Sequence, residues 1–333
     1  MDIITKFKQG LTEEDNIPKE KAEEAAVLIN ELSEFLEKRN KNFENVNSED
    51  LYKFSEELIN QERNTEFSYV NVLKFGYFTK NNELIKFGME VFDGSEVMVN
   101  FSKRLVEKYG EDFRNEIFQD LDIPPLGITP KEKPKYTKKL ISRFHEKVGE
   151  ESCVEFLAKG LRDPYYEWRK PDRERFLTSK NIDEFLKEKK RRFIESLEKH
   201  EKEGTLFFTQ EINKEALDYV KNQPSIESGV RKENILTVSK IPHETIKYLN
   251  EEDVMLKAYY YCHCPWVKES IKDGTVDEIP NAFCNCSGGY YKNYWEIVLD
   301  QPIEVKTVKT VISGDPICEF DIYLPEDIVK ELD

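Results

Sequence analysis

The sequence predicts an α+β protein, with a mainly helical N-terminal domain and a C-terminal α+β domain in which helices pack on an antiparallel sheet. Three observations lead to this class. Apolar residues recur at three- and four-residue steps through much of the first part of the chain, which is helical spacing. A proline-rich stretch then interrupts the pattern. Short β-rich runs with period-two alternation follow towards the C-terminus, as in half-buried strands.

The N-terminal domain is expected to consist mainly of helices. Residues 18–41 carry an apolar stripe at helical spacing. Ser48 is expected to cap a second helix with its own apolar stripe. Residues 68–90 mix strand and helix signals, and residues 95–109 return to helical spacing. We therefore assign residues 1–122 to a mainly helical domain.

Four prolines lie between Ile123 and Tyr136. Because proline lacks a backbone donor and forbids a continuous helix, residues 123–136 are expected to form a linker. The second domain would then span residues 137–333. Its first part is expected to hold two helices, at 136–161 and 182–204.

The last part of the second domain is expected to contain strands. Short β-rich runs occur at residues 205–209, 235–241 and 254–262. A helix is expected at 289–299. The segment 302–325 alternates at period two on both sides of a turn sequence, SGDP, and so predicts a β-hairpin packed under that helix.

Composition excludes some classes of partner. The chain has 333 residues and a net charge of −16, so phosphate backbones and anionic membranes would repel it. No apolar run reaches the length of a signal peptide core or a membrane span. We therefore expect a cytoplasmic protein with neither nucleic acid nor membrane as partner. In that compartment, cysteines persist as thiols, metal ligands or redox centres rather than as structural disulfides.

Four of the six cysteines form two C-x-C pairs, Cys262 with Cys264 and Cys284 with Cys286. On strands, each pair would point to one face of the sheet. Four thiolates that converge make a tetrahedral site suited to structural zinc, and an iron–sulfur cluster would need the same four thiolates. A redox-active cysteine and ordinary buried thiols are the alternatives. His263 would point to the opposite strand face, outside the metal shell.

Aromatic residues are dense around the cysteines. Such side chains with a few polar groups can line a small-molecule pocket, although an aromatic core would show the same pattern. The expected ligand-binding residues are Tyr261, His263, Trp266, Phe283, Tyr290, Tyr291 and Trp295. No catalytic residue is assigned.

The C-terminal part resembles the 4-vinyl reductase domain, a small-molecule-binding module. The resemblance is carried by a cysteine, a G-Y pair, a tryptophan and a closing G-D-x-x-C-x-F motif, here Cys286, Gly289, Tyr290, Trp295, Gly314, Asp315, Cys318 and Phe320. The same ending occurs in relatives of amino-thiazoline-carboxylate hydrolases and in uncharacterised cysteine-containing prokaryotic proteins. In zinc-binding members, the positions of Thr307 and Thr310 are an acidic residue and a cysteine, so their metal shell does not carry over whole. Cys318 keeps its match.

These observations lead to three functional hypotheses. The first is a sensor or regulatory protein that binds an apolar or aromatic small molecule beside a zinc held by Cys262, Cys264, Cys284 and Cys286, with Cys318 as a substitute ligand. The alternative is a metal- or cysteine-dependent hydrolase of the amino-thiazoline-carboxylate type. The third is an interaction or regulatory adaptor without a ligand. Homodimer formation stays open.

Overall fold

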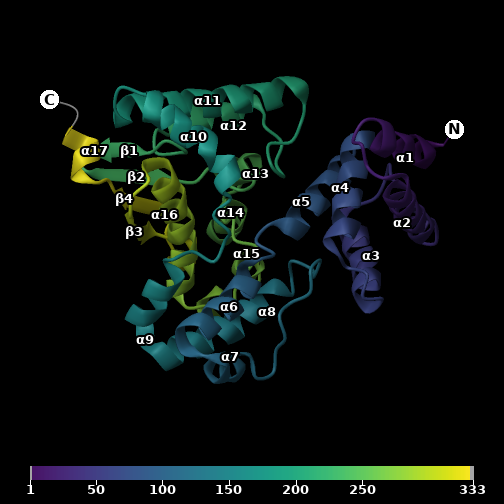
Figure 1. The fold of residues 1–333 in the computed structure, drawn as a ribbon, viewed down its shortest axis with the longest axis horizontal. Coiled ribbons are helices and arrows are strands. Elements are labelled where there is room, and N and C mark those ends of the chain that lie inside the picture. The colour runs from purple at the N-terminus through teal and green to yellow at the C-terminus, as the bar shows by residue number, and fades with distance from the viewer. Residues whose placement is uncertain (1, 331–333) are drawn as a thin grey trace. The chain divides into compact units, whose positions relative to one another are not determined.

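The computed structural model describes residues 2–330 and confirms the α+β class (Figure 1). Its contacts divide the chain into two compact units. The first unit is Met1–Ser95 with Pro124–Thr129, and the second is Glu96–Ile123 with Pro130–Asp333. None of the helices among the described residues is both long enough and apolar enough to cross a membrane.

The first unit consists of helices around one apolar core. Asn47, rather than the expected Ser48, caps the third helix, in a capping box with Asp50. The segment with mixed signals, 68–90, falls in two helices, because Thr65 and Asn81 each supply an N-cap side chain. The helices are α1 (Ile3–Glu13), α2 (Lys19–Glu37), α3 (Ser48–Asn60), α4 (Glu66–Thr79) and α5 (Asn82–Phe92).

The division between the units differs from the one expected at residues 123–136. The Ser55 hydroxyl donates to the Gly127 carbonyl (2.7 Å), which ties Pro124–Thr129 to the first unit. Asn100 donates to the Leu161 carbonyl (2.9 Å), in the second unit. Proline marks where a helix must stop, but these long-range contacts decide which core each segment joins.

In the second unit, one group of helices lies at one end, and the sheet lies at the other end together with further helices (Figure 1). A π-helical turn, 137–141, joins two of its helices. The helices are α6 (Val97–Tyr109), α7 (Glu111–Phe118), α8 (Lys133–Tyr136), α9 (Ser142–Leu157), α10 (Tyr166–Thr178), α11 (Ile182–Glu203), α12 (Lys214–Asn222), α13 (Thr245–Asn250), α14 (Val254–Tyr261), α15 (Lys268–Lys272), α16 (Asn285–Leu299) and α17 (Glu326–Lys330).

The sheet is antiparallel, with strand order β1-β2-β4-β3. The expected closing hairpin is confirmed, because β3 pairs directly with β4 and α16 packs on both (Figure 1). Phe320 of β4 lies between Val238 of β2 and Thr307 of β3 in the register. The strands are β1 (Val230–Lys232), β2 (Ile235–Ser239), β3 (Glu304–Lys309) and β4 (Glu319–Tyr323).

Two of the strand expectations fail. Residues 254–262 are not a strand: they form helix α14, because the Asp253 side chain accepts a hydrogen bond from the Leu256 amide (2.9 Å) and caps it. Residues 205–209 contain only an isolated bridge between Phe207 and Gln210. The helix expected from Gly289 starts earlier, at Asn285.

Candidate functional site

The two C-x-C pairs do not lie on strands, so the expected strand geometry is wrong. Cys262 is the C-cap of α14, and Cys264 follows in the loop before α15. Cys284 ends a 3₁₀ turn, and Cys286 lies in the first turn of α16. Cys318 directly precedes β4. The sheet and α16 therefore bring a fifth cysteine into this region from far along the chain.

Two glycines of α16 let it pack closely enough to place these residues. A Cβ on Gly289 would lie 2.1 Å from the backbone nitrogen of Gly160, so only glycine fits there. A Cβ on Gly288 would lie 2.9 Å from the Thr307 hydroxyl on β3. The first turn of α16, with Cys286, is thus held between the Gly160 turn and the sheet.

The five thiols form one electrostatic cluster. Burial raises the pKa of Cys262 to about 11, and the Cys318 thiol contributes to that rise. Burial also raises the pKa of Cys264 and of Cys284, to which neighbouring cysteines add. The pKa values of Cys286 and Cys318 are raised by burial as well. All six cysteines of the chain are free, so without a metal these thiols stay protonated near neutral pH.

The sixth cysteine lies apart from this cluster. Cys153 is fully buried on α9. Burial raises its pKa to about 12, with a smaller contribution from Glu150 and none from another cysteine. We assign it no metal role, and it serves as a matched control for the cluster.

Backbone amides and two cations favour the thiolate form within the cluster. The Cys264 amide hydrogen bonds to the Cys262 sulfur, and the Trp266 amide to the Cys264 sulfur. The Lys240 ammonium lowers the pKa of four of the thiols against the larger effect of burial. Arg162 does so for Cys264 and Cys286. No pattern in the sequence points to either cation, because both reach the cluster only through the fold.

The chemistry of this donor set fits a thiophilic metal, since buried thiols with amide donors to sulfur are what such sites use. The side chains as they stand are not arranged as a finished site. Among residues 2–330, no group of three or more His, Cys, Asp or Glu side chains is close enough together to hold a metal ion. Metal binding would therefore require the sulfur atoms to turn towards one another.

The surroundings of His263 disfavour the charged form of its ring. Its Nε2 hydrogen bonds to the Ile241 carbonyl, and its ring packs edge-on against His243, with centroids 5.2 Å apart. Burial, then the nearby His243, lowers the pKa of His263 well below its usual value. The expected position on a strand face is wrong, because the residue follows a helix.

The seven expected ligand-binding residues differ in their packing and exposure. Trp295 packs into the core under the sheet, where its ring centroid lies 6.1 Å from that of Phe185. Trp266 packs against Tyr136, and their ring centroids are 6.4 Å apart. Tyr261 and Phe283 are buried, whereas Tyr290 is 39% exposed. Tyr291 connects to the cysteine cluster, because its ring lies 4.8 Å from Phe320 and its pKa, raised by burial, also responds to Cys318.

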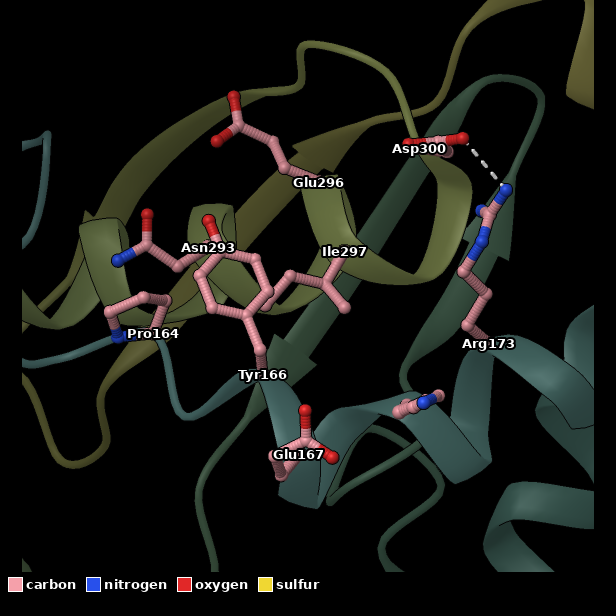
Figure 2. A pocket seen from close by; sticks show the side chains of 9 residues that line it. Pro164, Tyr166, Glu167, Arg173, Asn293, Glu296, Ile297 and Asp300 are labelled. Atoms are coloured by element: carbon pink, nitrogen blue, oxygen red, sulfur yellow. Dashed lines mark hydrogen bonds and ion pairs between the residues drawn. The ribbon is translucent and has the colours of Figure 1, made fainter.

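A groove of about 370 Å³ lies between α10 and α16 (Figure 2). Its lining is strongly charged, and an ion pair between Arg173 and Asp300 (2.8 Å) closes one end. None of the seven expected ligand-binding residues lines it. The lining residues are Pro164, Tyr166, Glu167, Lys170, Arg173, Asn293, Glu296, Ile297 and Asp300.

Comparisons with protein-family models, curated proteins and solved structures found no match for this chain. The resemblance to the 4-vinyl reductase domain therefore stays a prediction from the residues that carry it.

Proposed function

We propose that the second unit binds a zinc ion through Cys262, Cys264, Cys284 and Cys286, with Cys318 as a substitute ligand, and acts as a small-molecule-binding sensor or regulatory module. The observation that carries this proposal is the gathering of five buried or half-buried thiols in one region of the fold, where the charge on one can change the pKa of another. Structural packing of small apolar residues does not need five thiols in one region of the fold.

The charges around the cluster support a metal bound by thiolates. Zinc with four thiolates carries two net negative charges, and burial of that charge is costly unless it is compensated. Lys240 and Arg162 supply two positive charges near the sulfurs. Amide hydrogen bonds to Cys262 and Cys264 stabilise thiolates further. An iron–sulfur cluster would use the same ligands, and metal analysis separates the two.

The proposed small-molecule site adjoins the metal through α16. Cys286 and Tyr290 are four residues apart on this helix and so share a face. A metal that fixes Cys284 and Cys286 would also fix the start of α16 and the tyrosines one turn later. Ligand binding at those tyrosines and metal binding at the cysteines would then stabilise the same helix.

The hydrolase alternative has less support. A nucleophilic cysteine needs a lowered pKa or an adjacent base. Here burial raises the pKa of every thiol in the cluster. The neighbouring His263 hydrogen bonds to a backbone carbonyl rather than to a thiol.

The test is metal analysis of the purified full-length chain and of single Cys→Ser variants. We expect zinc in the wild type, its loss in variants of Cys262, Cys264, Cys284 or Cys286, and its retention in Cys153→Ser. A chelator should lower the melting temperature of the wild type, because metal binding is coupled to folding. A metal-free wild type, or zinc kept by all four variants, would contradict the proposal.

A further inference from the structure

Arg169 on α10 is a buried cation whose terminal nitrogens find no hydrogen-bond acceptor within the described part of the chain. Arg169 is only 5% exposed. Both Nη1 and Nη2 are buried and have no hydrogen-bond partner among the described residues. A guanidinium in this state is costly, because it has lost water and gained no acceptor. Such a group needs a partner from outside the chain.

The nearest aromatic rings form a frame around the guanidinium. Its carbon lies 4.6 Å from the Tyr290 ring centroid and 5.8 Å from that of Tyr294. These contacts offset part of the charge but supply no hydrogen-bond acceptor. Tyr290 is 39% exposed, so this frame reaches the surface on the side of that ring.

The acidic groups in this region are already engaged. Asp172, three residues further along α10, accepts a hydrogen bond from the Tyr294 hydroxyl (2.7 Å) and pairs with Arg175 (2.9 Å) and Arg192 (3.1 Å). Glu227 pairs with Lys189, whose ammonium lies 4.9 Å from the Tyr294 ring. Positive charge is therefore in excess around the tyrosines, and an anion would balance it.

We propose that Arg169 binds the carboxylate of the small molecule that this unit recognises, with Nη1 and Nη2 as a two-donor fork. A carboxylate presents two oxygens in the plane and spacing that a guanidinium matches. One free fork suits a carboxylate better than a phosphate, whose further oxygens would need further donors. The flanking tyrosines favour an aromatic or apolar body on the ligand. This inference rests on the proposed small-molecule binding.

The experiment measures binding of sodium benzoate by calorimetry, with acetate, phenylacetate and octanoate as further carboxylates, inorganic phosphate as another anion and benzyl alcohol as a neutral probe. The variants are Arg169→Met, which removes the charge, and Arg169→Lys, which keeps the charge without the fork. Arg173→Met is the matched control, because Arg173 lies one turn further along α10, pairs with Asp300 and lines the groove.

We expect at least one carboxylate to bind the wild type and Arg173→Met alike, and to bind Arg169→Met roughly tenfold or more weakly. Arg169→Lys should be intermediate. Without ligand, Arg169→Met should melt no lower than the wild type, because an unpaired buried charge has been removed.

Five results would overturn the inference. Carboxylate binding that is equal in Arg169→Met and wild type would do so, as would loss of binding in Arg173→Met alone, which would place the ligand in the groove. A lower melting temperature of ligand-free Arg169→Met would show that Arg169 has a structural role instead. If benzyl alcohol binds and no carboxylate does, the role of Arg169 fails while small-molecule binding stands. If no probe binds, both fail, and the zinc content of the same samples still tests the metal proposal.

Discussion

Gly289 stands where α16 crosses the turn at Gly160, and alanine there is expected to destabilise the second unit. The new Cβ would lie 2.1 Å from the Gly160 nitrogen, 2.3 Å from its Cα and 2.8 Å from the Ala158 carbonyl oxygen. Ordinary contacts begin at 3.4 Å, and all three atoms belong to backbone. The helix would have to withdraw by roughly 1 Å, since no side chain can rotate away.

Two opposing effects set how much Gly289→Ala changes the free energy of unfolding. Alanine gains up to about 1 kcal/mol over glycine in helix propensity, whereas overpacking typically costs about 1–3 kcal/mol. Because the contact is with rigid backbone, the cost of overpacking at this site lies at or beyond the upper end of that range. We therefore expect the free energy of unfolding to fall by about 2 kcal/mol or more, measured by urea denaturation.

The matched control is Gly288→Ala, one residue earlier on the same helix. Its Cβ would meet one side-chain atom, the Thr307 hydroxyl at 2.9 Å, and its next neighbours only at 3.9 Å. This variant should lose less stability than Gly289→Ala. A Gly289→Ala protein as stable as the wild type, or more stable than Gly288→Ala, would refute the packing argument.

Three further predictions concern separate parts of the molecule. Asn47→Ala removes the capping box of α3 and should cost about 1 kcal/mol in urea denaturation; an unchanged midpoint would contradict this. Burial alone would raise the pKa of Glu244. The ammonium groups of Lys268 and Lys247 outweigh this effect and lower the pKa from 4.5 to about 2. The folded-state pKa is below the unfolded one, so this stabilisation, up to roughly 3 kcal/mol, is complete above pH 4.5 and lost as pH falls towards 2. Glu244→Gln should flatten the acid side of the stability profile, and a profile that keeps its slope would count against it. Lys240→Met should weaken zinc binding roughly ten- to hundredfold in chelator competition, and equal affinity would remove Lys240 from the site.

Local patterns in the sequence predicted the elements whose stability is local. The helix at 182–204 and the closing hairpin follow directly from apolar spacing and turn residues. A strand was expected at 254–262 because its run of tyrosines favours strands. The segment is a helix instead, because the Asp253 side chain caps α14. That cap was visible in the sequence and outweighs the propensity of the aromatic run.

The candidate site was predictable only in part, for the same reason. The cysteine-rich region was apparent from its spacing, but Cys318 joins Cys262 and Cys284 only because β4 is added beside β2. Lys240 and Arg169 have no local signal at all. Their roles depend on long-range packing, which the spacing of residues along the chain does not specify.

We propose that cysteine thiolates hold a zinc ion in the second unit. X-ray absorption at the zinc edge on the purified full-length protein tests it most directly, because it reports the atoms bound to the metal. We predict about four sulfur neighbours at about 2.3 Å in the wild type and in Cys153→Ser, and loss of the zinc signal in Cys262→Ser. A shell of nitrogen and oxygen alone, or a spectrum unchanged by Cys262→Ser, would contradict the account.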